Sequence, residues 1–384
     1  DPSCVYSLNC TGLGCMDSNA LNYDPYASID DSSCLYCVYG CMDTIAPNYD
    51  SLATCDDGSC SFPTVYGCND PNATNYNSNV TFNDGSCLYI KTYVPDDIFE
   101  SWLESNGYGD GIGYNDSVLT SSVQGISSLG LNNLNITDVT GIQDFTNLHS
   151  VDLNFNNLQS VNFSNLSNLT YVNIRFNYDL NTANFTGCYS IQNLLLDGNK
   201  LTQLILPDST YGSAYNCQNF DYCWIDVLSL ENNDTTLILD FPPAFRLRQL
   251  NIRSSDIDSL DVSSLGDLYF LRATDSHISS LDLSNNTALE VLYAQDCDSL
   301  EVVDLRNKTN LSSVKLENND LLSNLDMRNI DLVNISNNNH DFRNTPNLNC
   351  ISVDNIALAN ALLTNTDPSC VYSLNCTGLG CMDS

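Results

Sequence analysis

The hydrophobic positions between residues 121 and 346 recur at a nearly constant spacing. From Ile126 the pattern L-x-x-L-x-L-x-x-N returns at steps of mostly 21 or 22 residues, for example as LHSVDLNFN and LSSVKLENN. Such a repeat predicts a leucine-rich-repeat solenoid, because each coil supplies one short strand and buries its leucines against the next coil. The predicted coils start at Ile126, Leu148, Leu169, Ile191, Ile225, Leu247, Leu268, Leu289, Leu311 and Ile330.

The ninth position of each coil turns the chain, and we expect its side chain to bond the backbone of the adjacent coil. Asparagine occupies it at Asn156, Asn177, Asn199, Asn233, Asn319 and Asn338, and Ser255, Ser276 and Cys297 replace it elsewhere. The first coil has Leu134 there, so its turn must be satisfied in another way. The longer step before Ile225 predicts an inserted loop within about residues 207–223.

Both flanks of the solenoid, which we place at residues 121–346, have the character of caps. Residues 90–120 predict a short amphipathic helix that begins after Pro95, followed by a loop rich in Gly and Asp. Residues 347–370 lead into a helical stretch rich in Ala and Leu. The expected fold class is therefore a mostly β and irregular leucine-rich-repeat solenoid with a helical cap.

Three segments before the solenoid align without gaps and predict three small modules, at residues 14–39, 40–66 and 67–89. A unit of about 26 residues cannot bury enough surface to fold alone, so a disulfide within each is expected to stabilise it. Zinc is not expected, because a site needs four ligands and the modules contain no histidine. The expected bridges join cysteines 19 positions apart, namely Cys15–Cys34, Cys41–Cys60 and Cys68–Cys87.

Acidic residues recur at matching positions of the three modules. Carboxylate and amide oxygens on tight turns suit a hard cation such as Ca²⁺. The alternative is that Asp and Asn simply form the turns. The calcium hypothesis rests on Asp17, Asp24, Asp31, Asp43, Asp50, Asp57, Asp70 and Asp84.

The first eighteen residues, DPSCVYSLNCTGLGCMDS, are identical to residues 367–384. Chance does not produce an identity of this length, so we expect a tandem array whose unit has 366 residues. In that reading residues 1–13 end one unit or link it to the next, and residues 371–384 begin another copy. Further copies of the unit in the same chain are then its first partners.

The motif GC-D-x-x-A-x-N-Y-D followed by D-D-G-S-C resembles short repeats of secreted Bacteroidota proteins, and it covers residues 14–89. The flanks VPDDIF and NLNCISVD are similar to the caps of Bacteroidota secreted leucine-rich-repeat proteins. The resemblance implies secretion, a stalk or spacer role and no chemistry. It also implies a bridge between Cys350 and Cys370.

The remaining cysteines of one unit leave alternatives open. One unit has fifteen, and the odd count requires unpaired residues. We interpret Cys55, Cys188 and Cys297 as small buried apolar residues. Cys217–Cys223 is expected inside the inserted loop and Cys10–Cys37 follows by elimination, whereas a pairing of Cys188 with Cys217 or Cys223 is the alternative.

A net charge of −35 excludes several kinds of partner. Such a surface repels nucleic acid and anionic lipid, and no stretch has the apolar length of a membrane helix. Eighteen cysteines indicate an extracellular, secreted protein.

No motif indicates catalysis, so we expect no enzyme. His149, His277 and His340 are far apart in sequence, and nucleophile elbows, zinc-protease helices and phosphate-binding loops are missing from the sequence. Acidic pairs occur everywhere and single out no glycosidase-like site.

Binding is the better alternative to a purely structural role. The exposed side of the solenoid strands is expected to carry Tyr171, Arg175, Arg253, Phe270, Arg272, Tyr293 and Lys315. Aromatic rings beside Arg suit a glycan or an acidic protein. The alternative is a solvated surface without a ligand.

Two functions follow as hypotheses. The first is a structural unit of a giant surface fibre or filament, used for adhesion, motility or prey capture, with several chains bundled laterally into a homo-oligomer. The second is a secreted binding module for glycan or protein, with the cysteine modules as calcium-stabilised spacers.

Overall fold

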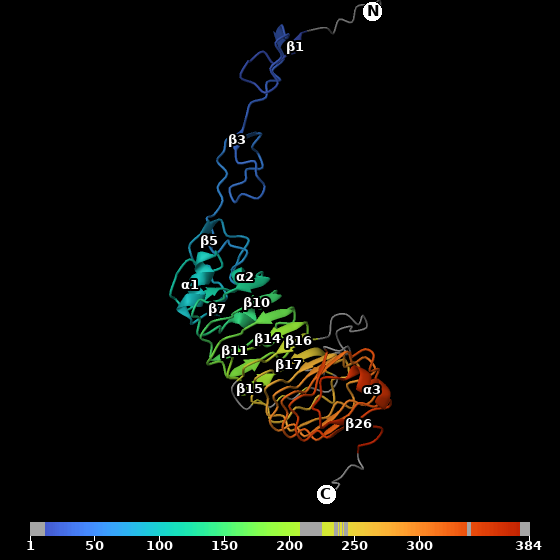
Figure 1. The fold of residues 1–384 in the computed structure, drawn as a ribbon. Helices are drawn as coiled ribbons and strands as arrows, with labels where there is room; N and C mark the ends of the chain where they lie inside the picture. The colour runs from blue at the N-terminus through green and yellow to red at the C-terminus, as the bar shows by residue number, and fades with distance from the viewer. Residues whose placement is uncertain are drawn as a thin grey trace, which may run out of the picture. The chain divides into compact units, whose positions relative to one another are not determined.

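The computed structural model describes residues 12–207, 225–233, 237, 239, 241, 245–335 and 339–376. The chain divides into two compact units, Asp1–Leu88 and Tyr89–Ser384 (Figure 1). Cys10, Cys217, Cys223 and Asn338 lie outside the described residues, and so do the bridges predicted for the first three.

Each module of the first unit has one short parallel ladder and is otherwise built from turns. β1 (Leu13–Gly14) pairs with β2 (Ile29–Asp30), β3 (Tyr39–Gly40) with β4 (Cys55–Asp56), and β5 (Tyr66–Gly67) with β6 (Phe82–Asn83). The three bridges expected from the repeated spacing are present, each with a Cα–Cα distance of 4.7 Å.

One asparagine in each module holds the segment that carries the closing cysteine. Asn22 donates from Nδ2 to the Ser33 carbonyl at 2.8 Å and accepts at Oδ1 from the Leu35 amide at 2.8 Å. Asn48 and Asn75 form the same pair of bonds in the other two modules. Hydrogen bonds to backbone thus replace most of the core that so short a segment cannot form.

The prediction for Cys37 and Cys55 was wrong, because these two residues form a bridge with each other. Parallel pairing aligns Tyr39 with Cys55, which brings Cys55 beside the segment that precedes β3. The position is not an apolar core site, since Phe82 is 55% exposed at the same place in the third module. In the third module the Phe82 ring packs edge-on against the Tyr66 ring, with centroids 5.3 Å apart. This ring contact takes the place of the Cys37–Cys55 bridge of the second module.

The second unit opens with a cap that covers the first coil. β7 (Lys91–Tyr93) pairs antiparallel with β8 (Ser117–Leu119) on either side of α1 (Asp97–Ser105), the helix predicted after Pro95. Asp96 caps α1, and its carboxylate also accepts from the Thr137 amide at 2.7 Å. Two shorter helices complete the region, α2 (Thr120–Val123) and η1 (Ile142–Asp144).

The solenoid is confirmed as a stack of coils whose first strands form one parallel ten-stranded sheet (Figure 1). Register partners lie about one repeat apart, as Val151 with Val172 and Leu271 with Leu292. Its strands are β9 (Ser128–Gly130), β10 (Ser150–Asp152), β12 (Tyr171–Asn173), β14 (Asn193–Leu195), β16 (Ile225–Ser229), β17 (Leu247–Asn251), β18 (Phe270–Arg272), β20 (Val291–Tyr293), β22 (Ser313–Lys315) and β24 (His340–Asp341).

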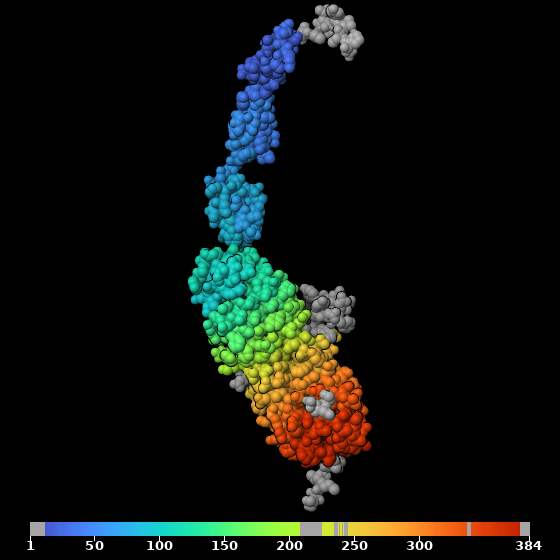
Figure 2. Space-filling model, turned by 45° about the horizontal axis from the view of Figure 1, so that its top comes forward, coloured from blue at the N-terminus to red at the C-terminus, as the bar shows by residue number. Residues whose placement is uncertain are grey.

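Shorter parallel sheets form a second side of the coils. One contains β11 (Ser160–Asn162), β13 (Thr182–Asn184) and β15 (Gln203–Ile205). The other contains β19 (Ser280–Leu281), β21 (Val302–Asp304), β23 (Asn324–Asp326), β25 (Cys350–Ser352) and β26 (Val371–Ser373). The leucines between the two sides form one continuous core, and successive coils follow one another as bands of colour in Figure 2. α3 (Ile356–Leu362) lies in the final cap.

The predicted turn ladder is present in the coils. Asn156 donates from Nδ2 to the carbonyls of Leu131 and Leu153, at 2.8 and 2.9 Å. Its Oδ1 accepts from the Leu134 amide at 3.1 Å, which explains how the first coil manages without an asparagine. Ser255 substitutes with its hydroxyl, which donates to the Leu230 carbonyl at 2.6 Å and lies 3.4 Å from the Arg253 carbonyl.

Two expectations at the end of the solenoid were wrong. Val314 pairs with His340, so the last coil does not start at Ile330. The connection before β24 is longer than expected and buries Leu332 and Ile335, which moves the start of the last coil further along the chain. Cys350 bridges to Cys376 and not to Cys370, which is a free thiol. Pairing of β25 with β26 places Cys370 just before the strand, and the bridge forms after it.

No helix in the part of the chain that the structure describes combines the length and the apolar character needed to cross a bilayer.

Candidate functional site

The outward side of the ten-stranded sheet displays the basic and aromatic residues predicted from sequence. The middle residue of each short strand is buried, as at Val172, Leu271 and Leu292, so the residues on either side point outward. The register places Arg272, Tyr293 and Lys315 beside one another on three successive strands.

Four of the predicted residues form one cluster, which we name the basic–aromatic patch: Phe270, Arg272, Tyr293 and Lys315. The Phe270 and Tyr293 rings meet edge-on with centroids 5.9 Å apart. Lys315 Nζ lies 5.3 Å from the Tyr293 ring centroid, in the range of a cation–π contact. Arg272 Nε is buried and has no hydrogen-bond partner among the described residues.

The other predicted residues do not join this patch. Tyr171 lies on β12, and β14, β16 and β17 separate that strand from β18, a distance of about 19 Å at ordinary strand spacing. Arg175 forms an ion pair with Asp197, and Arg253 NH1 lies 2.9 Å from Glu231 Oε1. The sequence placed these cations on one face but gave no sign that neighbouring acids neutralise two of them.

Acidic side chains continue across the same face and flank the patch. The Glu231 amide donates to Asp197 Oδ1 at 2.8 Å, and Asn251 Nδ2 donates to Glu231 Oε2 at 3.2 Å. Beyond the patch, Gln295 Nε2 donates to Glu317 Oε1 at 3.3 Å, and burial raises the pKa of Glu317. The face therefore alternates in charge and is not a uniformly basic surface.

The module aspartates predicted as calcium ligands each form a local turn. In every case one carboxylate oxygen accepts the backbone amide two residues ahead, at 2.8 or 2.9 Å. Hydrogen bonds from the side chains and amides of Ser33, Ser59 and Ser86 lower the pKa of Asp31, Asp57 and Asp84. This geometry is the turn chemistry that the sequence offered as the alternative.

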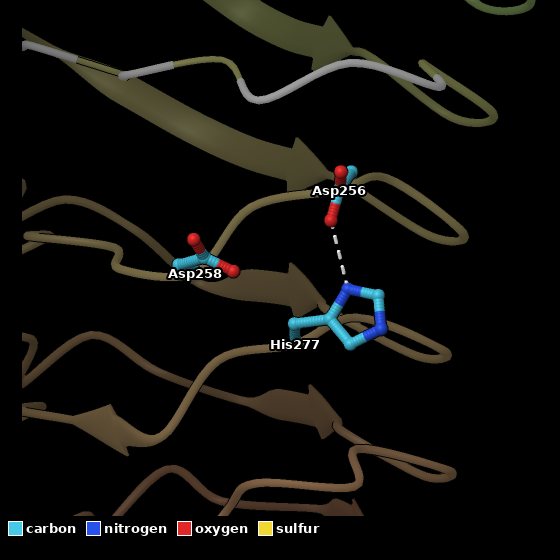
Figure 3. Close-up of side chains that lie close together, drawn as sticks. All are labelled: Asp256, Asp258 and His277. Carbon is cyan, nitrogen blue, oxygen red and sulfur yellow. Dashed lines mark hydrogen bonds and ion pairs between the residues drawn. The ribbon is translucent and has the colours of Figure 1, made fainter.

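Two groups of side chains in the described residues bring three ligand atoms within 4.8 Å of one another, and neither includes a module aspartate. One consists of Asp256, Asp258 and His277, with His277 Nδ1 2.9 Å from Asp256 Oδ1 (Figure 3). His277 is therefore not isolated, although the three side chains are largely open to solvent. In the other group, Glu100 accepts the Asn115 amide and orders the cap loop.

An aromatic ledge formed by Phe155, Phe176 and Tyr178 was not predicted. The rings of Phe155 and Phe176 stack at 4.6 Å, and both residues have positive φ, of 54° and 57°. Bulky residues adopt this conformation at a cost of about 1 kcal/mol each, and the other described coils place Asn, Asp, Ser or Gly there. The visible signal was a Phe directly before the ladder asparagine, in LNFN and IRFN.

Gly198 makes room for the ledge. A Cβ on Gly198 would lie 2.5 Å from Phe176 Cδ1, so any side chain there would displace the ring. Phe176 and Tyr178 border an open hollow of about 330 Å³, together with Gly198, Asn199, Lys200 and Asn232. The ledge is a second surface on which a flat apolar group could stack.

The unpaired cysteines have the character of packing residues. Cys188 and Cys297 are fully buried, as predicted, and burial raises the pKa of Cys188 to about 12 and that of Cys297 as well. Burial also raises the pKa of Cys370 to about 11. Because the thiolate is the reactive form, none of the three is activated as a nucleophile.

A scan against protein-family models finds no match, and a search of the curated proteins finds none either. Similar solved structures include internalin C2 from Listeria monocytogenes, with 18% identity, a TM-score of 0.34, and coverage of 70% of this chain and 100% of that one. Another is an internalin, inlF, from the same organism, with 17% identity, a TM-score of 0.31, and coverage of 72% and 95%. The functional domain of InlJ, described as including a cysteine ladder, has 17% identity, a TM-score of 0.23, and coverage of 72% and 80%.

Proposed function

We propose that this chain is one unit of a tandem, extracellular structural array, a surface fibre or filament used for adhesion, motility or prey capture. The observation that carries the proposal is the identity of residues 1–18 and 367–384. Supporting it, both compact units are themselves built from repeats, three modules in one and stacked coils in the other. Repeats that contact their sequence neighbours are the usual way to build long, thin proteins.

The extracellular location is supported by the disulfides. The described residues contain the bridges Cys15–Cys34, Cys37–Cys55, Cys41–Cys60, Cys68–Cys87 and Cys350–Cys376. Such bridges form and persist in oxidising compartments. The net charge of −35 suits a protein that must remain dispersed in salt.

The array is tested by the size and shape of the protein in its source. Intact-mass measurement of the native protein should give a multiple of the 366-residue unit, and electron microscopy of shed material should show filaments with a regular axial repeat. Lateral bundling of several chains, which identical repeated surfaces favour, would appear as filaments wider than one solenoid. A native mass near that of one unit would refute the proposal.

Calcium binding by the modules is a subsidiary part of the proposal. Each turn-forming aspartate uses a carboxylate oxygen for a backbone amide, and carboxylate oxygens held on tight turns are ligands that Ca²⁺ prefers. Unfolding of the modules is measured with calcium and with excess chelator. A higher midpoint with calcium would support a site, and equal midpoints would remove it.

A second candidate function is recognition of a glycan or acidic protein at the basic–aromatic patch. It is favoured by the register that places Arg272, Tyr293 and Lys315 side by side, and by the Lys315 ammonium lying 5.3 Å from the Tyr293 ring centroid. Retention on immobilised glycans or acidic peptides is compared between the native chain and Arg272→Gln, with Arg253→Gln as the control because Glu231 already pairs that arginine. Retention that falls only with Arg272→Gln supports binding, and unaltered elution of all three chains argues against it.

A further inference from the structure

The last coil of the solenoid is built from a sequence that occurs twice in the chain. We name Asp367–Cys376 the closing strap; its sequence, DPSCVYSLNC, is identical to residues 1–10. The strap contains β26, which pairs in parallel with β25 along Cys350–Ser352. Cys376 then forms the bridge with Cys350.

The strap is bound to the cap at several points. Asp367 accepts the amides of Asn344 and Thr345, at 2.9 and 2.8 Å. The Tyr372 hydroxyl donates to the Leu363 carbonyl at 2.6 Å, and its ring packs against the core. These contacts use side chains of the strap itself, so they depend on its sequence.

Without the strap, β25 would be an open edge. Cys350, Ile351 and Ser352 are buried, and on this side they pair with Val371, Tyr372 and Ser373 of the strap. The Val371 amide also donates to the Asn349 carbonyl at 3.0 Å. An unpaired edge of this kind is a template for another strand of suitable sequence. The chain carries such a strand a second time, at residues 1–10.

We propose that residues 1–10 are the closing strap of a preceding copy of this chain, with Cys10 bridged to Cys350 of that copy and Cys4 left as a thiol. The partner is thus a second copy, and the inference deepens the proposed array by defining its junction. By the same identity, Thr11 would be the single residue between the strap and Gly12, whose carbonyl accepts the Ile29 amide at 2.9 Å in the first module. Successive units would therefore be joined by a bridged strand and a one-residue connection.

The first test uses the full chain and two labelled decapeptides in a glutathione redox buffer. One peptide has the sequence of residues 1–10 with Cys4→Ser, and the other has Cys10→Ser. We expect the Cys4→Ser peptide to exchange into the Cys350 bridge and release Cys376, and the Cys10→Ser peptide not to couple, as read by peptide mapping. The proposal would be overturned if the peptide that keeps only Cys4 coupled, or if both peptides coupled equally. It would also be overturned if neither peptide coupled although the Cys350–Cys376 bridge had opened.

The second test removes residues 367–384, which opens the acceptor and retains residues 1–10. Oxidation should convert this shortened chain into a ladder of head-to-tail oligomers, which Cys10→Ser abolishes and Cys4→Ser leaves intact, while the full chain stays monomeric. A folded shortened chain that remains monomeric would refute the junction, and if it does not fold the peptide exchange decides. Because native mass tests the array and these experiments test the strap, either idea can fail alone.

Discussion

In the described part of the first unit, only seven apolar side chains are buried, and three of them are cysteines in bridges. The solenoid has a single core that runs through every coil. The contrast shows two ways to stabilise the units of a repeat protein. A module of fewer than thirty residues needs covalent closure, whereas a coil obtains burial from the next coil and needs no bridge.

The distribution of bridges follows this difference. Within the described residues of the solenoid unit one bridge is present, and it lies at the terminal cap, where a coil has no following neighbour. The cysteines in the interior, Cys188 and Cys297, remain thiols and act as packing residues. Bridges thus occur where stacking cannot supply the stability.

Reduction of the disulfides should produce the largest difference in stability between the modules and the solenoid. Each module bridge closes a loop of 18 or 19 residues and contributes about 3 kcal/mol, so residues 12–88 should unfold with reductant while the coils remain folded. Limited proteolysis with peptide mapping, before and after reduction and alkylation, measures this. Modules that still resist the protease after complete alkylation would contradict it.

Removing a buried side chain from one coil should destabilise the solenoid and leave the modules unaffected. Leu292→Ala empties a fully buried position in β20 and should lower the free energy of unfolding of the solenoid by about 2–5 kcal/mol. Denaturant unfolding measures the loss, and the half-buried neighbour Val291→Ala is the control with a smaller expected effect. Equal losses for the two variants would show that β20 does not face the core as described.

Two substitutions of Asn177, which remove different numbers of its hydrogen bonds, test the turn ladder. This buried side chain bonds the carbonyls of Leu153 and Ile174 and the amide of Leu158. Asn177→Ala leaves these groups unpaired and should destabilise the solenoid by about 2–3 kcal/mol. Asn177→Ser should lose less, because Ser255 supports a ladder position through its hydroxyl. Thermal unfolding that ranks serine below alanine would contradict the ladder.

A buried lysine gives the smallest expected effect. Lys308 is 1% exposed and donates only to the Arg306 carbonyl, at 3.2 Å, among the described residues; burial lowers its pKa despite Asp304 and Asp282. Because the unfolded chain holds this proton more tightly, solenoid stability should rise as pH increases from the folded pKa toward about 10.5.

Lys308→Met should therefore be the more stable chain at pH 7, by about 1 kcal/mol, with the difference shrinking as the pH rises toward about 10.5. Denaturant titrations of both chains at pH 7 and pH 10.5 measure it, and exposed Lys200→Met, which should change little, is the control. A Lys308→Met chain that is less stable at pH 7 would show that the ammonium is well solvated in the fold.

The leucine period predicted the solenoid, and the cysteine spacing predicted the three module bridges, because both are short-range patterns in the sequence. The ladder asparagines followed for the same reason, since each coil repeats one local geometry. The leucine period no longer predicted the strand position at the end of the solenoid. There Leu332 and Ile335 are buried in a longer connection, and the last strand forms at His340, later in the chain than the period predicted.

Only the tertiary structure decided which distant groups meet. Cys37 reaches Cys55 through a parallel ladder, and Cys350 reaches Cys376 through a strand that forms only when the last coil is closed. Likewise Arg175 and Arg253 meet acids one coil away, at Asp197 and Glu231, and both pairings depend on strand register. Spacing along the chain sets which residues share a face, but contacts between coils determine which of them are neutralised, bridged or left available.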